Sequence, residues 1–324
     1  MQRRARIAAV AVLAAVLGLG AVVAADPYVL VRAQFARQRI AAGLDQATLD
    51  VAGHRWAYAH ADDAPAGAPL VVMVHGFTGS KENWYPLADR LRDRYRVVVP
   101  DLPGWGESQR IDGADYGFAA QAERVAAFIQ RVAGDAPRGE LVLLGHSMGG
   151  GIAALVAARH PDLVDRVALL DAAGVRFADN RFGIDVLAGR NPFEVTDAAS
   201  LDGYLDVLFQ RDDARPWIPW PASRGYVDRR RAQAAFEQDV LARIGRGPER
   251  FAPGDAAAGI RQPALLLWGA QDRVIDPSAM GLYAQRMPHA TQVLLDDAGH
   301  MALMEHPDAV AAAVTALIER GQPR

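Results

Sequence analysis

Cysteine is absent from the 324-residue chain, which excludes disulfides, thiol catalysis, Cys-ligated zinc and iron–sulfur clusters. Lysine is almost absent, because Lys81 is the only lysine among the 35 basic residues. The net charge is -3, with 38 acidic residues and no basic block interleaved with aromatics, which argues against nucleic acid as a partner. With 51% hydrophobic and 23% charged residues, the chain has the composition of an ordinary folded protein. Any catalysis therefore uses oxygen and nitrogen groups, and no motif requires a metal or an organic cofactor.

The N-terminus holds the longest uncharged run of the chain. Residues Ile7–Ala25 contain no charged side chain and follow three Arg within the first six residues. A helix over this run would be about 28 Å long, nearly the thickness of a bilayer core. We expect a single-pass anchor over residues 1–31 and an amphipathic juxtamembrane helix over residues 32–46. Arg at the N-terminus then predicts a catalytic domain on the periplasmic or outer side of a bacterial cytoplasmic membrane.

Two other interpretations of this segment stay open. Small residues before Asp26 resemble a signal-peptidase site, and cleavage there would give a secreted or periplasmic protein. A buried core helix is disfavoured, because the run precedes an otherwise complete domain. If the helix is retained, small-residue pairs such as Ala14 with Gly18 offer a close approach for a homodimer.

Short apolar runs alternate with segments of helical period through most of the chain. The strands are expected at residues 48–51, 55–60, 70–74, 96–99, 141–144, 167–170, 264–268 and 292–295. Helical-period segments separate many of these runs, as at residues 118–132 between two of the strands. Such alternation predicts an α/β fold, with a mostly parallel sheet and helices on both faces.

The alternation is interrupted for about ninety residues after Asp171. Ten of the 24 aromatic residues lie between Val175 and Arg261. We therefore expect a core over residues 47–174 and 263–324, and a helical cap over residues 175–262.

The peptide Gly145-His146-Ser147-Met148-Gly149-Gly150 follows an expected strand and precedes a helical segment. This pattern predicts a nucleophile elbow, in which a sharp strand-to-helix turn presents the serine hydroxyl above the sheet edge. Glycines two positions before and after Ser147 fit such a turn, because a side chain there would collide with the backbone. The following helix N-terminus offers free N–H groups to a developing anion.

Other motifs occur in the order found in a known family. They are His75–Ser80, Asp101–Ser108, Gly269–Val274 and Ala298–Met301, each directly after an expected strand. With the elbow, these motifs resemble the α/β-hydrolase family over residues 70–174 and 263–310. The order Ser, Asp, His is also that of this family.

The resemblance implies a catalytic triad of Ser147, Asp272 and His300. A serine hydroxyl needs a base to remove its proton, and a carboxylate must hold that imidazole in the correct tautomer. We assign His300 as the base and Asp272 as the residue that orients it. Asp276 is the nearest rival acid, but its place before Pro277 predicts capping of the next helix.

The oxyanion of the tetrahedral intermediate needs preset donors. The family pattern implies the backbone N–H groups of Phe77 and Met148. Substrate-pocket walls are expected at Trp105, Trp217 and Trp220, of which the last two lie in the cap.

The residue types narrow the reaction class. Epoxide hydrolases and haloalkane dehalogenases of this fold have Asp at the elbow, whereas this chain has Ser147. Carbon–carbon hydrolases typically have Asn before the serine and Trp after the histidine, whereas this chain has His146 and Met301.

The motifs most resemble the monoacylglycerol lipase and membrane-anchored bacterial lipase or phospholipase A group. That resemblance implies a serine hydrolase of lipid esters, acylglycerols or phospholipids, working at a membrane. A soluble-ester esterase, a carbon–carbon hydrolase and a non-catalytic ligand-binding protein stay as alternatives.

Overall fold

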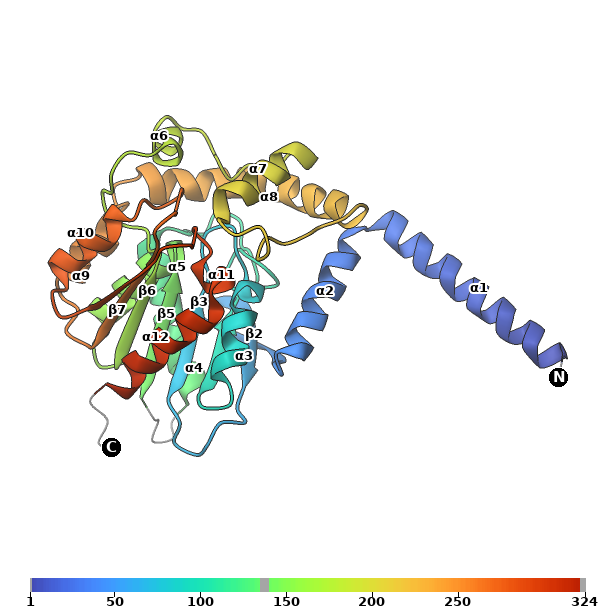
Figure 1. Ribbon diagram of the computed structural model, residues 1–324, viewed down its shortest axis with the longest axis horizontal. Helices are drawn as coiled ribbons and strands as arrows, with labels where there is room; N and C mark the ends of the chain where they lie inside the picture. Colours follow the sequence, from blue (N-terminus) through green and yellow to red (C-terminus); the bar gives the residue numbers. More distant parts are fainter. Residues whose placement is uncertain (1, 135–139, 321–324) are drawn as a thin grey trace.

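One sheet of eight strands forms the centre of the described part of the chain, residues 2–134 and 140–320 of a computed structural model (Figure 1). The strands are β1 (Asp45–Val51), β2 (His54–Ala61), β3 (Leu70–Val74), β4 (Arg96–Pro100), β5 (Leu141–His146), β6 (Arg166–Leu170), β7 (Ala264–Gly269) and β8 (Thr291–Leu295). Their order is β1-β2-β4-β3-β5-β6-β7-β8. The pairs β1·β2 and β2·β4 are antiparallel, and all the other neighbouring pairs in this order are parallel. The expected α/β class is confirmed.

The middle strands β3, β5, β6 and β7 are buried along their whole length. Helices cover both faces of such strands, so their sequences are continuous apolar runs instead of alternating ones. Parallel strands also end at one edge of the sheet. The residues that follow β3, β5 and β7 include His75, Ser147 and Asp272, so this edge gathers the motif residues.

Two groups of helices flank the sheet, some packed on its strands and others on neighbouring helices. The first group is α3 (Tyr85–Leu91), α11 (Ala302–Glu305) and α12 (Pro307–Glu319). The second group is α4 (Phe118–Ala133), α5 (Met148–Arg159), α9 (Ala252–Ala257) and α10 (Ser278–Arg286). A short 3₁₀ helix, η1 (Lys81–Trp84), precedes α3.

Three helices of the expected cap lie over the edge of the sheet that gathers the motif residues (Figure 1). They are α6 (Arg181–Leu187), α7 (Ala198–Leu208) and α8 (Ala222–Arg246), and α8 contacts both of the others. The fourth helix of the segment, α9, packs instead on α5 and α4. The predicted boundary between cap and core at residue 262 stays a prediction. Helix α9 belongs to the expected cap by sequence, but it packs on helices that flank the sheet.

The N-terminal segment forms two helices, α1 (Gln2–Ala25) and α2 (Tyr28–Ala41). Helix α1 projects away from the rest of the molecule, whereas α2 packs on α8 (Figure 1). The approach of α2 is close, because a Cβ at Gly225 would collide with the backbone of Tyr28. The helix expected over residues 32–46 thus begins earlier and ends before β1.

The expectation of a single-pass anchor is corrected by the structure. Among the described residues, no helix has both the length and the apolarity needed to cross a membrane. A span requires about 20 predominantly apolar residues in one helix, and the run Ile7–Ala25 that suggested such a span has 19. The localisation in the cytoplasmic membrane through this span was therefore wrong.

Candidate active site

Ser147 occupies a strained turn between β5 and α5. Its backbone has φ 54° and ψ −120°, a conformation that is rare for a residue with a side chain. A Cβ at Gly145 would collide with the carbonyl of Gly149, and a Cβ at Gly149 would collide with the carbonyl of Val74. The turn therefore requires glycine at both positions, as the elbow motif predicts.

His300 and Asp272 are brought together from the loops after β8 and β7. The Nδ1 atom of His300 lies 2.8 Å from Oδ2 of Asp272, and both side chains are buried. The other carboxylate oxygen of Asp272 accepts hydrogen bonds from the backbone N–H groups of Val274 and Ile275, at 2.8 and 3.0 Å. This arrangement can hold a proton on Nδ1 of His300 and leave its Nε2 free to accept one.

The rival acid lies elsewhere. Oδ1 of Asp276 accepts a hydrogen bond from the backbone N–H of Ser278 at 2.9 Å, the first residue of α10. Ser147 and His300 line the same cavity but share no hydrogen bond among the described side chains. Such bonds are often long in a free enzyme and shorten when substrate binds.

The predicted oxyanion donors are Phe77, in the loop after β3, and Met148, directly after Ser147. Neither the N–H of Phe77 nor that of Met148 has an acceptor within the described chain. A Cβ at Gly76 would lie 3.0 Å from Cβ of Ser147, so the loop carrying Phe77 passes directly beside the serine. Thr78 ties this loop to the cap through a 2.8 Å hydrogen bond between its Oγ1 and the hydroxyl of Tyr204.

His75 connects the loop that carries Phe77 to the loop after β4. Its Nε2 accepts a 2.9 Å hydrogen bond from the N–H of Leu102, and its Nδ1 donates to the carbonyl of Gly76 at 2.7 Å. Burial lowers the pKa of His75 to about 4. A neutral ring is therefore kept as a structural bridge between the loops after β3 and β4.

The single lysine supports this region in a way that the motifs do not reveal. Nζ of Lys81 is buried and lies 2.8 Å from Asp101, 2.9 Å from Glu82 and 2.8 Å from Glu107. Burial alone would lower the pKa of Lys81, but Asp101 and Glu82 raise it above its ordinary value. The charged lysine thus joins η1 to the loop after β4.

Glu305 is a second residue that sequence reasoning missed. One carboxylate oxygen accepts the N–H of Gly299 at 2.8 Å, and the other accepts those of Gln210 and Arg211, each at 2.8 Å. Gly299 adjoins His300, whereas Gln210 and Arg211 follow α7 of the cap. The only signal in the sequence is an acidic residue five positions after His300, and it does not identify these partners.

Asp171, which directly follows β6, is a third residue that sequence reasoning missed. It is fully buried with φ 47°, and its Oδ1 accepts the N–H of Gly269 at 2.9 Å. Its Oδ2 has no partner among the described residues. Burial, and then the charge of Asp272, raise the pKa of Asp171 well above its ordinary value, so Asp171 binds a proton more readily than an exposed aspartate does.

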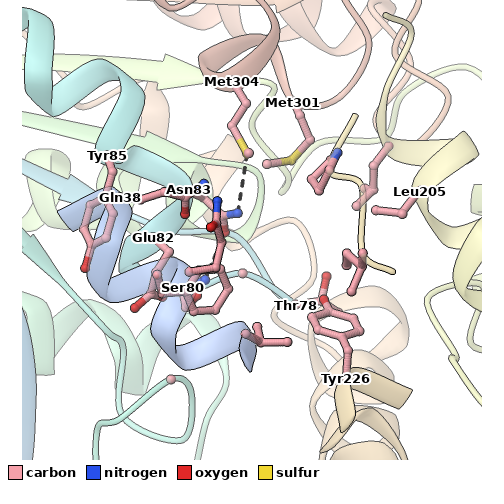
Figure 2. A pocket seen from close by; sticks show the side chains of 18 of the residues that line it. Gln38, Thr78, Ser80, Glu82, Asn83, Tyr85, Leu205, Tyr226, Met301 and Met304 are labelled. Carbon is pink, nitrogen blue, oxygen red and sulfur yellow. Dashed lines mark hydrogen bonds between the residues drawn. The ribbon is translucent and has the colours of Figure 1, made fainter. Parts of the chain in front are cut away.

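Two cavities meet at Ser147. The larger one has a volume of about 850 Å³ and reaches from His300 to α2 and to the loop before α8. Figure 2 shows its polar side, with Ser80, Glu82 and Asn83, and its apolar side, with Leu205 and Met301. The smaller cavity has a volume of about 120 Å³ and extends under α6 and α8.

All three tryptophans expected at the pocket line the larger cavity, but in different ways. Trp105 is buried, with its ring centroid 6.3 Å from that of Phe77. Trp217 and Trp220 are 87% and 77% exposed, so they form the rim instead of the wall. No group of three or more His, Asp or Glu side chains in residues 2–134 and 140–320 is placed to hold a metal ion.

Comparison with known proteins gives a consistent result. The family model described as alpha/beta hydrolase fold matches residues 69–307. Lipase 3 of Moraxella sp. (strain TA144) is 29% identical over 258 residues, which is 78% of each chain. A monoacylglycerol lipase of Rattus norvegicus is 26% identical over 264 residues, covering 77% of this chain and 75% of that protein.

A solved structure extends the similarity to nearly the whole chain. It is described as a membrane phospholipase A and a novel bacterial virulence factor. It superposes with a TM-score of 0.84 at 33% identity, covering 98% of both chains.

Proposed function

Because the chain belongs to the alpha/beta hydrolase fold family and is a serine ester hydrolase, we propose that it cleaves lipid esters through an acyl-enzyme on Ser147. The observation that carries this proposal is the 2.8 Å contact between His300 and Asp272 beside the strained serine. The substrates proposed are acylglycerols or phospholipids.

In the first half-reaction, Oγ of Ser147 attacks the ester carbonyl carbon while Nε2 of His300 takes the hydroxyl proton. The carbonyl oxygen becomes an oxyanion that accepts hydrogen bonds from the backbone N–H groups of Phe77 and Met148. Asp272 stabilises the positive charge on the imidazolium of His300. Collapse of the intermediate breaks the bond to the alcohol oxygen, which receives the proton from His300. The acyl group stays on Ser147.

In the second half-reaction, water takes the place of the alcohol. His300 removes a proton from the water, and the resulting oxygen nucleophile attacks the acyl-enzyme carbonyl. The same donors stabilise the second oxyanion. Return of the proton to Oγ of Ser147 releases the carboxylic acid and regenerates the enzyme.

The preference for lipid esters is supported by the size and surface of the larger cavity. Its volume of about 850 Å³ lies at the upper end of small-molecule sites, so it has room for more than a small ester. Exposed Trp217 and Trp220 at its rim give an apolar entrance. The relatives named as lipase, monoacylglycerol lipase and phospholipase A point to the same substrate class.

The test is a release assay on the full chain. Monoacylglycerols, phosphatidylglycerol vesicles and p-nitrophenyl esters of graded chain length are supplied, and the Ser147→Ala variant is the control. We expect fatty-acid release from at least one lipid class, with kcat/KM above that for the p-nitrophenyl ester of acetate. Hydrolysis of soluble short esters only would favour the esterase alternative, and no turnover of any ester would refute the proposal.

A further inference from the structure

We infer that the smaller cavity binds the acyl chain of the substrate and that the larger cavity binds its alcohol part. The two cavities then bind the groups on opposite sides of the ester bond that is cleaved. This inference rests on the proposed function and adds the division of the substrate between the two spaces. It predicts an enzyme that discriminates among acyl chains by length and tolerates large alcohols.

The first step is the geometry of the tetrahedral intermediate. Its carbon carries four groups: Oγ of Ser147, the oxyanion, the alcohol oxygen and the acyl chain. The oxyanion is held between the N–H groups of Phe77 and Met148. The alcohol oxygen must lie within reach of His300, because that residue protonates it as it leaves. The acyl chain takes the remaining direction.

The second step is the position of His300 relative to the cavities. His300 lines the larger cavity together with Ser147, and it does not line the smaller one. Met148 lines the smaller cavity together with Ser147, and it does not line the larger one. The side on which the alcohol leaves is therefore the larger cavity, and the space beyond Met148 is left for the acyl chain.

The chemistry of the two linings agrees with this assignment. The larger cavity has side-chain donors and acceptors, including Ser80, Glu82 and Asn83 (Figure 2), which suit a hydroxyl-bearing alcohol such as glycerol. The smaller cavity is walled mainly by apolar side chains. These include Phe118, Phe182, Val186, Leu241 and Ile244. Four of these five are buried, which suits a methylene chain.

The size of the smaller cavity sets the chain length. Its volume of about 120 Å³ is close to the roughly 150 Å³ that holds a six-carbon ring in another protein. Each methylene buried there should raise kcat/KM about fourfold. We therefore expect kcat/KM to rise from acetyl to about hexanoyl and to rise no further beyond that length.

The experiment fills each cavity separately. In Val186→Trp, an indole enters the smaller cavity, and in the matched control Leu205→Trp an indole enters the larger one. For each variant, kcat/KM is measured on p-nitrophenyl esters from acetyl to dodecanoyl, and on hexanoyl esters of methanol and glycerol. Leu241→Phe serves the same purpose if Val186→Trp does not fold.

Val186→Trp should lower the hexanoyl-to-acetyl ratio of kcat/KM at least 30-fold, whereas Leu205→Trp should keep this ratio within about threefold. Leu205→Trp should instead lower the ratio of glyceryl to methyl hexanoate. The reverse pattern, or an acyl profile unchanged by filling the smaller cavity, would overturn the assignment. Labelling of Ser147 by a fluorophosphonate separates the two proposals: with labelling intact, only the cavity assignment fails, and without labelling in the unsubstituted chain the proposed function fails too.

Discussion

Glu305 offers a sharp prediction, because its buried carboxylate connects the loop that carries His300 to the cap. It accepts the N–H of Gly299 on one side and those of Gln210 and Arg211 on the other. In Glu305→Gln the amide oxygen can accept hydrogen bonds either from Gly299 or from Gln210 and Arg211, but not from both sides. The NH₂ group then faces N–H donors with which it cannot form a hydrogen bond. At least one charge-assisted hydrogen bond is lost, which costs about 2–4 kcal/mol of unfolding free energy when the unpaired donor is included.

The catalytic consequence follows from the neighbour of Gly299. A displaced Gly299 moves His300 relative to Ser147, and a 1 Å misplacement of a reacting group costs about 10²-fold in rate. We expect kcat on a soluble short ester to fall about 10- to 100-fold with little change in KM, because the substrate walls are untouched. The melting temperature should fall by about 5 °C.

Steady-state kinetics and calorimetry on the full chain check both effects. The matched control is Asp308→Asn, which removes one exposed carboxylate three positions further on and should change the unfolding free energy by no more than about 0.5 kcal/mol. A lower melting temperature with unchanged kcat would show that Glu305 only stabilises the fold. If neither kcat nor the melting temperature changed, the inference that Glu305 connects the His300 loop to the cap would be refuted.

Other predictions concern the triad, the rim and the buried histidine. Ser147→Ala or His300→Ala should lower kcat by about 10⁴–10⁶-fold, and Asp272→Asn by about 10⁴-fold, with unchanged circular dichroism; a lesser loss in an ester assay would contradict the assigned roles. Trp217→Ala should reduce hydrolysis of vesicle lipids more than that of soluble esters, because the side chain is 87% exposed; an equal effect on both would count against a lipid entrance. Because the folded pKa of His75 is lowered to about 4, the unfolded state binds more protons between about pH 6.5 and 4, so unfolding free energy should fall by roughly 3 kcal/mol as pH drops through this range. Denaturant titrations of His75→Asn should show a weaker pH slope, and an equal slope would refute the assignment to His75.

The strands were predictable because their physical signal is local. Buried parallel strands are continuous apolar runs, and the expected strands at residues 70–74 and 264–268 agree with β3 (Leu70–Val74) and β7 (Ala264–Gly269). The elbow was predictable for a related reason, since only glycine fits the close contacts on either side of Ser147. These features depend on residues that are neighbours in sequence.

The supports of the site were not predictable, because they depend on contacts between distant segments. Glu305 meets Gln210 across 95 positions, and Lys81 meets Asp101 across 20. Nothing in a single sequence shows which buried carboxylate meets which donor. The exposure of Trp217 likewise depends on how the cap folds, and the run Ile7–Ala25 suggested a membrane span that the described helices do not provide.

The central claim is that hydrolysis passes through an acyl group carried by Ser147. The most direct measurement mixes the full chain with p-nitrophenyl hexanoate, quenches the reaction in acid within the first turnover, and locates any acyl group on proteolytic peptides by mass spectrometry. We predict one hexanoyl group, on the peptide that contains Ser147, and none in the Ser147→Ala variant. An acyl group on another residue, or sustained turnover by Ser147→Ala, would contradict the account.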